Sequence, residues 1–516
     1  MRKWLVVLLV VAVLGTSGTL YWQHQQAEQR KRDRAAALAV ASRFLTLWRS
    51  KQYDGMGALT VADPDAGVSY ARLAERLKAS SVVPQPRGLS ADGRSLRYTV
   101  TAQLEGLGEL SWDNDVRTQK TGRGWRVAFS SAAVFPGLRN GQVLTRSDPL
   151  VSRGELTDRR GVPLRSASAD LAANVLGSTG AAKTGLERIY DSRLSGTSGG
   201  DVQVVARGTG QVVQLVKHFP ARAATPVRTT LDVTVQRAAE AALATVPGPS
   251  ALVAIDVATG EVRAIANHPI VGLPPALRSE APGSTFKVVV AEAALEHGLT
   301  PASTVPCPAK VVFGGKAFGN DEPLPTSMTL ATAFARSCNT AFLSIADGFP
   351  KGTVGKIAGL FGFGRGDLLP IGGQGGDVPA PGSTSEAYAD IIGQGRVEAS
   401  PLLLASMSAA VASGTWRQPH LVVGPVPSNT VPNAGALRLL MRQVVTVGTA
   451  ARAGLPTGTA GKTGTAQYGT QVPLPTHAWF TGYRGGLAFC VYVKDGASGG
   501  SVAAPVAARF LRALAV

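Results

Sequence analysis

The segment Ala281–Lys287, with the sequence Ala-Pro-Gly-Ser-Thr-Phe-Lys, constrains this chain more than any other, and an apolar run from Val288 to Leu295 follows it. Ser284 is the only serine in the 516 residues that has a lysine three positions after it. Positions three apart share one face of a helix, so we expect the Ser284 hydroxyl to lie beside the Lys287 amine. The Pro-Gly pair before the serine suits a turn that begins a helix. Burial of this helix would favour an uncharged lysine, which can take a proton from the serine and make it a nucleophile.

Two further patterns follow in chain order. The first is Ser337-Cys338-Asn339, of the form Ser-x-Asn, and the second is the run Lys-Thr-Gly-Thr at 462–465. A single Ser-x-x-Lys pattern occurs by chance, as a capping serine followed by a lysine that reaches water. The ordered set of Ser-x-x-Lys, Ser-x-Asn and Lys-Thr-Gly is typical of β-lactamases and penicillin-binding proteins, and it therefore favours a catalytic interpretation.

The Lys-Thr-Gly pattern occurs three times, beginning at Lys120, Lys183 and Lys462. The first copy lies between two strand-like runs and reads as a hairpin turn. The second precedes the other two motifs. Only the copy at Lys462 follows both of them, so we select it as the functional one.

The three motifs resemble the active-site motifs of penicillin-binding transpeptidases. The segment Arg153–Gly161 is similar to the start of the non-catalytic domain of class B members, and Gly185–Asp191 resembles the family's Gly-Leu-Glu-x-x-Tyr-Asp run. Thr229–Asp232 is similar to the entry into the catalytic domain, and Gly393–Gly395 with Ser400-Pro401 resembles a further family signature. The resemblance covers about residues 145 to 516.

The resemblance implies a serine β-lactamase-like catalytic domain and a role for each motif residue. Ser284 is the expected nucleophile and Lys287 its base, while Ser337 relays a proton and Asn339 orients Lys287 and the substrate. Lys462 supplies positive charge. Thr463, Gly464 and Thr465 are the expected substrate-binding residues, and the backbone N–H groups of Ser284 and Thr465 are expected to form the oxyanion hole.

The expected reaction is D,D-transpeptidation of peptidoglycan through a serine acyl-enzyme that β-lactams would trap. The alternatives are a serine β-lactamase, a D,D-carboxypeptidase and a β-lactam sensor that does not turn over. The sequence offers no identifiable deacylating glutamate, and the few residues before the N-terminal apolar run are too short for a sensor output. The expected partners are stem peptides, β-lactam antibiotics and the cell membrane, with other cell-wall synthesis proteins as further candidates.

The chain length suggests about three domains. We expect a multidomain α+β protein: a stub, anchor and linker over 1–34, a module over 35–140, a non-catalytic (dimerisation-type) domain over 141–230, and the transpeptidase domain over 231–516. The module at 35–140 resembles an NTF2-like domain in its order of elements. Helices are expected at Ala35–Trp48 and Tyr70–Ser80, and strands at Leu96–Leu104, Gly108–Asp113, Val116–Lys120 and Gly124–Ala132.

The catalytic region has its own predicted elements. A hairpin is expected from Leu252–Asp256 and Glu261–Ala266. The segment Thr329–Phe342 is expected to carry the Ser-x-Asn motif at a helix end or at a junction between two helices. Edge strands are expected at Lys462–Gln467 and Trp479–Gly482, a buried strand at Leu487–Val493 and a closing helix from Val502 to Val516.

The N-terminus bears on location. Arg2 and Lys3 precede an apolar run from Trp4 to about Trp22, which is long enough to cross a bilayer as a helix. A cleaved signal peptide is the alternative, but the run has no clear cleavage site and ends in interfacial aromatic residues. We therefore expect a single-pass membrane protein whose catalytic domain lies outside the cytoplasm.

Charge and cysteine content exclude some classes of function. The net charge of +18 suits anionic partners, but the arginines are spread out and no nucleic-acid motif is present, so we expect no nucleic-acid binding. The three cysteines have no metal-type spacing, which predicts no metal site, and we expect no cofactor. A disulfide between Cys307 and Cys338 remains open at this stage, because its geometry cannot be read from the sequence.

Overall fold

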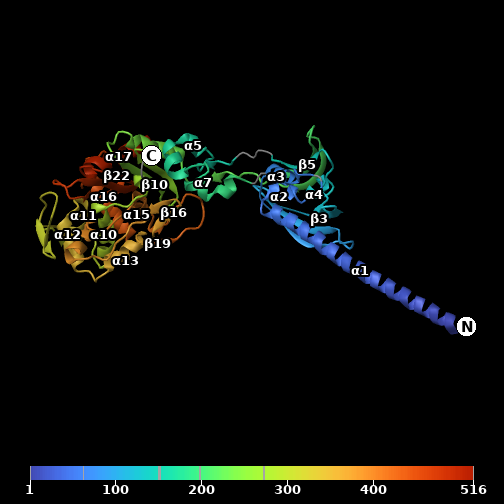
Figure 1. Ribbon diagram of the computed structural model, residues 1–516. Helices are drawn as coiled ribbons and strands as arrows, with labels where there is room; N and C mark the ends of the chain where they lie inside the picture. Colours follow the sequence, from blue (N-terminus) through green and yellow to red (C-terminus); the bar gives the residue numbers. More distant parts are fainter. Residues whose placement is uncertain (1, 62, 149–152, 197–198, 271–273, 515–516) are drawn as a thin grey trace. The chain divides into compact units, whose positions relative to one another are not determined.

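The computed structural model describes the backbone of residues 2–61, 63–148, 153–196, 199–270 and 274–514, and it describes side chains from residue 21 onward. The chain divides into two compact units. Unit 1 contains residues 1–153 and 195–224, and unit 2 contains residues 154–194 and 225–516 (Figure 1). The segment 141–230, expected as one non-catalytic domain, therefore contributes to both units.

Unit 1 begins with the helix α1 (Arg2–Arg49), followed by the short helix α2 (Tyr53–Gly57) and by α3 (Ala66–Arg76). An antiparallel sheet follows in the order β1-β2-β3-β4, with bounds Ala79–Leu89, Ser95–Leu104, Gly108–Thr121 and Gly124–Val127. The short helix α4 (Ser131–Val134) precedes a second sheet of β5 (Gln142–Ser147), β7 (Gly200–Ala206) and β8 (Val212–Phe219).

The core of unit 1 explains why these elements pack. Phe44 and Trp48 lie on one face of α1 and contact the ring of Tyr70 from α3. The hydroxyls of Tyr70 and Tyr98 both donate to the carbonyl oxygen of Ala133, so two buried phenols share one acceptor. The α+β order expected for 35–140 is present, although the two strands predicted at 108–113 and 116–120 form a single strand, β3.

The predicted anchor, from Trp4 to about Trp22, forms part of α1. The side chains of its residues up to 20 lie outside the described part of the chain. Within the part that is described, none of the helices is both long and apolar enough to span a membrane.

Unit 2 is built on a five-stranded antiparallel sheet in the order β11-β10-β22-β21-β20. The strand bounds, in that order, are Val262–His268, Ser250–Asp256, Leu487–Val493, Thr476–Arg484 and Ala460–Gln467. β20 is an edge strand, as expected. The prediction of an edge strand at Trp479–Gly482 is wrong, because β21 lies between β22 and β20 and its side chains there are fully buried.

Helices cover this sheet and carry the site. α9 (Val233–Leu243) and α17 (Ala504–Ala513) pack together on it, and α15 (Pro401–Ser413) packs against β10 and β22 (Figure 1). The remaining longer helices are α10 (Lys287–Glu296), α11 (Leu330–Ala335), α12 (Asn339–Asp347), α13 (Thr353–Leu360), α14 (Thr384–Ile391) and α16 (Ala434–Thr446). Two short strands, β6 (Leu156–Thr157) and β9 (Val227–Arg228), pair in parallel. Between them in the sequence lie the short helices α5 (Leu164–Ala167), α6 (Ala169–Leu171), α7 (Gly185–Ile189) and α8 (Asp191–Leu194).

Candidate active site

Ser284 lies in a short 3-10 helix, η3 (Gly283–Phe286), which runs directly into α10. Gly283 has a φ of 53°, and its N–H donates to the carbonyl oxygen of Gly393 at 2.8 Å. A Cβ on Gly283 would lie 2.4 Å from the carbonyl oxygen of Thr465 on β20. This close approach requires glycine, and it places Ser284 against the edge strand that carries the Lys-Thr-Gly motif.

Lys287 is the first residue of α10 and is fully buried. Its Nζ donates to the carbonyl oxygen of Ser337 at 2.7 Å and to Oδ1 of Asn339 at 2.6 Å. Burial, and then the nearby charge of Lys462, hold the pKa of Lys287 well below its usual value. A neutral amine has two hydrogens, which these two acceptors use, so its lone pair remains available to accept a proton.

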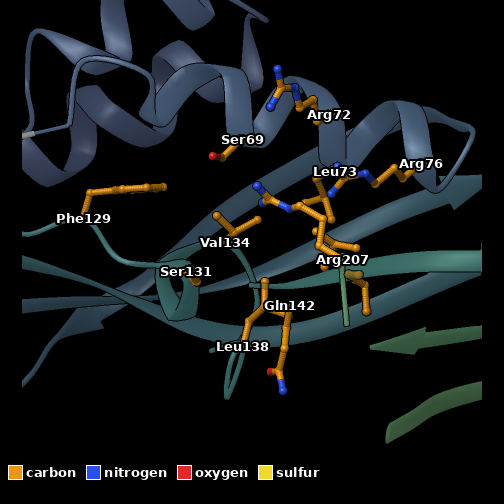
Figure 2. Close-up of a pocket in the computed structure, with 12 residues that line it drawn as sticks. Ser69, Arg72, Leu73, Arg76, Phe129, Ser131, Val134, Leu138, Gln142 and Arg207 are labelled. Carbon is orange, nitrogen blue, oxygen red and sulfur yellow. The ribbon is translucent and has the colours of Figure 1, made fainter. Parts of the chain in front are cut away.

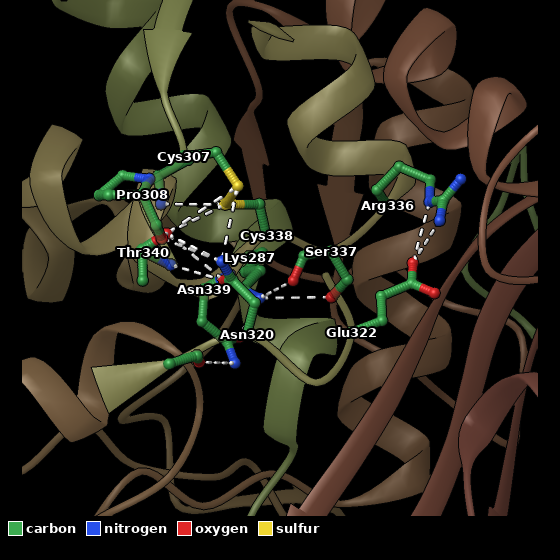
Figure 3. Close-up of a disulfide and its surroundings, with 12 residues drawn as sticks. Lys287, Cys307, Pro308, Asn320, Glu322, Arg336, Ser337, Cys338, Asn339 and Thr340 are labelled. Atoms are coloured by element: carbon green, nitrogen blue, oxygen red, sulfur yellow. Dashed lines mark hydrogen bonds and ion pairs between the residues drawn. A yellow bond between two sulfur atoms is a disulfide. The ribbon is translucent and has the colours of Figure 1, made fainter. Parts of the chain in front are cut away.

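Ser337 lies at the junction of α11 and α12, as the sequence analysis expected, and has a φ of 57°. This left-handed conformation is uncommon for a residue with a side chain and is often found at functional sites. It brings Ser337 Oγ between two lysine amines, 3.3 Å from Lys287 Nζ and 3.0 Å from Lys462 Nζ (Figure 3 shows the contact with Lys287). The hydroxyl is therefore placed to pass a proton between them.

The Lys-Thr-Gly-Thr run lies on β20. Lys462 is fully buried, its Nζ also donates to the carbonyl oxygen of Thr463 at 2.9 Å, and burial lowers its pKa to about 7. A Cβ on Gly464 would lie 2.6 Å from the carbonyl oxygen of Pro282, so this glycine also permits the approach of the serine turn. Thr465 Oγ1 accepts a hydrogen bond from the N–H of Gly499 at 3.3 Å.

The motif residues surround one cleft of about 540 Å³. Ser284, Ser337, Thr463 and Thr465 line it directly, while Lys287 and Lys462 are buried and contact Ser337. The other lining residues are Asn320, Asp321, Glu322, Leu324, Arg336, Val447, Gly448, Thr449, Ala451, Arg452, Ser498 and Gly500. Four of the selected residues therefore line this cleft, Lys287, Lys462 and Asn339 join them through hydrogen bonds, and Gly464 lies on β20 facing Pro282. Among the described residues, the hydrogen bonds of Lys287 Nζ go to Ser337 and Asn339 and not to Ser284.

The other two Lys-Thr-Gly copies have different surroundings. Lys120 lies where β3 turns into β4, as expected for a hairpin, and its amine pairs with Asp33 at 2.8 Å. Lys183 pairs with Asp191 at 3.3 Å. Both lysines are partly exposed, whereas the Lys462 side chain is buried at the cleft.

Asn320 is a site residue that the sequence analysis did not select. Its Oδ1 accepts from the N–H groups of Asn339 at 2.8 Å and of Thr340 at 3.2 Å, at the start of α12. Its Nδ2 donates to the carbonyl oxygen of Pro308 and to Oγ1 of Thr340, both at 3.1 Å (Figure 3). Asn320 therefore holds the Ser-x-Asn turn, but nothing in its local sequence indicates this, because its partners lie 12 to 20 residues away.

The disulfide that the sequence left open is present. Cys307 and Cys338 are bonded, with their Cα atoms 6.4 Å apart, and both side chains are buried (Figure 3). Cys338 is also the N-cap residue of α12, where its sulfur accepts from the N–H of Ala341. The bond thus ties the middle residue of the Ser-x-Asn motif to the segment that precedes Pro308.

Comparison with known proteins agrees with this geometry. The model of the penicillin binding protein transpeptidase domain matches residues 250–512. The peptidoglycan D,D-transpeptidase PbpA of Mycobacterium tuberculosis (strain H37Rv) is 33% identical over 269 residues, which are 44% of this chain and 53% of that protein. PbpA of Mycolicibacterium smegmatis is 34% identical over 280 residues, with the same two shares. The chain thus spans about half the length of these PbpA relatives.

Two solved structures share the fold. A chain from a peptidoglycan synthase complex that coordinates polymerization and crosslinking aligns with a TM-score of 0.63 and 24% identity, over 73% of this chain and 92% of that one. Penicillin binding protein 3 from Mycobacterium tuberculosis, complexed with aztreonam, aligns with a TM-score of 0.59 and 23% identity, over 72% and 96% of the two chains.

The matched domain takes in Ser284, Ser337 and Lys462, the three positions at which the motifs meet around one cleft, and it covers half of the chain. The chain belongs to the penicillin-binding protein transpeptidase family.

Proposed function

We propose that this chain is a class B peptidoglycan D,D-transpeptidase that forms peptide cross-links through an acyl-enzyme at Ser284. One observation carries the proposal: the buried Lys287, whose pKa burial holds well below its usual value, contacts Ser337, which also contacts Lys462, in the cleft that Ser284 lines. The names of the two PbpA relatives, which are peptidoglycan D,D-transpeptidases, support it.

In the acylation step, Ser284 Oγ attacks the carbonyl carbon of a D-alanyl-D-alanine stem peptide while Lys287 Nζ takes the hydroxyl proton. The backbone N–H groups of Ser284 and Thr465 stabilise the oxyanion, at about 2.7–4 kcal/mol per donor. When the tetrahedral intermediate collapses, the C–N bond breaks and the departing D-alanine amine receives a proton through Ser337. Lys462 and the hydroxyls of Thr463 and Thr465 hold the terminal carboxylate of the substrate.

In the second step, an amine from a neighbouring stem peptide attacks the ester carbonyl of the acyl-enzyme. Its proton passes to Lys287, the C–O bond to Ser284 breaks, and the serine oxygen regains a proton. The product is a peptide bond between two stems. A β-lactam would follow the first step only, because its ring-opened amine stays attached and occupies the place of the acceptor.

Hydrolytic alternatives need a group that activates water at the acyl-enzyme. Among the described residues that line the cleft, the carboxylates are Asp321 and Glu322. Both are exposed, and Glu322 is engaged with Arg336 at 2.6 Å. We therefore favour transfer to an amine over a β-lactamase, while a D,D-carboxypeptidase would use the same acyl-enzyme with water as the acceptor.

Incubation of the protein with labelled penicillin, followed by mass spectrometry of the adduct over hours, tests the proposal. We expect one adduct at Ser284 that persists for many minutes, and no adduct in Ser284→Ala. Stoichiometric labelling of that variant would refute the assignment of the nucleophile. Sustained nitrocefin turnover of about one per second or faster would instead assign the protein to the β-lactamases.

The proposal extends to the rest of the chain. We infer that Trp4 to about Trp22 acts as a membrane anchor, with the transpeptidase domain on the outer side of the cell membrane. Residues 35–140 serve as an NTF2-like module and 141–230 as the non-catalytic domain. Stem peptides and β-lactams are the ligands, and other cell-wall synthesis proteins are candidate partners. Protease protection in sealed vesicles tests the topology.

A further inference from the structure

A small cavity of about 60 Å³ in unit 1 is bordered by three arginines. Arg72 and Arg76 come from α3, where they share a face with Ser69 and Leu73 at helical spacing. Arg207 follows β7, some 130 positions later in the chain. The remaining lining residues are Phe129, Ser131, Val134, Leu138, Gln142, Val143 and Leu144, from the segment around α4 and from β5 (Figure 2).

Within the part of the chain that the structure describes, none of the three guanidinium groups donates a side-chain hydrogen bond or forms an ion pair. Arg146, on the neighbouring strand β5, shows the contrast: it pairs with Asp148 at 2.6 Å and donates to the carbonyl oxygen of Leu77. Among the described residues of unit 1, Arg146 is therefore paired with a carboxylate, whereas the three arginines of the cavity form no such ion pair.

The arginines are close enough to affect one another. Partial burial, and then the charges of Arg207 and Arg72, lower the pKa of Arg76, while Glu75 offsets this only weakly. The guanidinium groups stay charged at neutral pH all the same, since arginine is protonated throughout that range. Three unpaired cations held together repel one another, so an anion bound between them would relieve a cost that the folded chain otherwise carries.

The net charge of unit 1 also favours an anionic ligand. Unit 1 contains 25 lysines and arginines and 13 aspartates and glutamates, so it carries +12 of the chain's net +18 in 183 of its 516 residues. Such an excess attracts anions to the unit, and the cavity provides a place where donors from several directions meet. The Ser69 hydroxyl is a neutral hydrogen-bonding group that lines the same cavity.

We propose that this cavity, between α3, β5 and the end of β7, is a binding site for a phosphate group. A phosphate presents three or more oxygens that can accept from donors on different sides, and arginine forks match it well, whereas a carboxylate offers two oxygens in one plane. The phosphate can belong to a free or polymeric phosphate or to a lipid headgroup. This site is separate from the cleft, and it does not depend on the proposed transpeptidase activity.

Isothermal titration of the full chain in a non-ionic detergent, at constant ionic strength, tests the site. Inorganic phosphate is the first probe, monomeric dihexanoyl phosphatidylglycerol is the second, and acetate is the control anion. The test variant is Arg72→Gln with Arg207→Gln, since both side chains are exposed and their loss does not threaten folding. The matched control is Arg97→Gln with Arg123→Gln, which removes two exposed charges elsewhere in unit 1.

We expect saturable phosphate binding that weakens about tenfold or more in the test variant and stays within about twofold in the control. Arg76→Lys, which keeps the charge but loses the fork, should weaken binding by several-fold. Tighter binding of the lipid, with displacement by phosphate, identifies a headgroup as the source, whereas weaker lipid binding identifies a free or polymeric phosphate. The proposal is wrong if phosphate does not saturate, if test and control variants bind alike, or if acetate binds as well as phosphate.

Discussion

Asn320→Ala should slow acylation of Ser284 although Asn320 is outside the three motifs. Its amide makes five hydrogen bonds with nitrogen or oxygen atoms, and these join the start of α12 to the segment at Pro308. Alanine would leave the N–H groups of Asn339 and Thr340 without this acceptor. Asn339 would then be less well fixed, and its Oδ1 is the 2.6 Å acceptor for Lys287 Nζ.

The size of the effect follows from these bonds. A buried N–H without a partner costs about 1–3 kcal/mol, and the loss of a helix-capping acceptor costs about 0.5–2 kcal/mol. Asn320 is only half-buried and lines the cleft, so water can replace part of what is lost. We therefore expect a total cost of about 2 kcal/mol, which corresponds to a fall in Tm of about 4 °C. If this disorder reaches Lys287, acylation slows by about tenfold to a hundredfold.

Stopped-flow acylation with a fluorescent penicillin and thermal unfolding measure the two effects. Asn429→Ala is a matched control, because Asn429 also donates two amide hydrogen bonds, to the carbonyl oxygens of Gly359 and Leu360, but it does not line the cleft. It should lower Tm to a similar extent and leave the acylation rate unchanged. An Asn320→Ala variant that acylates within about twofold of the native rate would refute the positioning argument.

Three further outcomes follow from the buried charges and the repeated motif. Lys462→Ala should slow acylation roughly a hundredfold, while Lys120→Ala and Lys183→Ala leave it nearly unchanged; equal effects at the three lysines would mean that the wrong copy was selected. The acylation rate should fall at acidic pH as Lys287 takes up a proton. Lys462→Ala should move this fall to higher pH, because removing a nearby positive charge raises the pKa of Lys287. A pH-rate profile that is the same in the variant contradicts this expectation. Burial raises the pKa of Glu292 in the folded protein, so ionisation of Glu292 lowers stability as the pH rises above its pKa in the unfolded chain. Glu292→Gln should therefore lessen the loss of Tm between acidic and neutral pH. An unchanged difference in Tm between the two pH values would refute the burial argument.

The sequence predicted the site well where one motif carries the chemistry. Ser-x-x-Lys placed Ser284 and Lys287 at the start of a buried helix, and Ser337 was expected at a helix junction. The strands β10, β11 and β22 were also predicted, because apolar runs bounded by turns are a strong strand signal, and β20 was expected from the family resemblance of its Lys-Thr-Gly motif. Each of these predictions rests on residues that are close together in the chain.

Predictions failed where the answer depends on distant residues. The residue pattern of Trp479–Gly482 would be the same in an edge strand and in an internal strand. The strand is internal because it pairs with β22 as well as with β20. The bond between Cys307 and Cys338 and the hydrogen bonds of Asn320 each cross 12 to 31 positions. No periodicity encodes such contacts, so the sequence could leave the disulfide open but could not decide it.

The glycines of the site explain why separate motifs work as one. A Cβ on Gly283 would lie 2.4 Å from the carbonyl oxygen of Thr465, and a Cβ on Gly464 would lie 2.6 Å from that of Pro282. A Cβ on Gly393 would lie 2.0 Å from the carbonyl oxygen of Gly283. A side chain at any of these positions would push the serine turn away from β20. The distance from the nucleophile to the Lys-Thr-Gly strand is therefore set by residues that have no side chain. Substitution of such a glycine should harm acylation as severely as the loss of a catalytic group, although the lysines and serines remain in place.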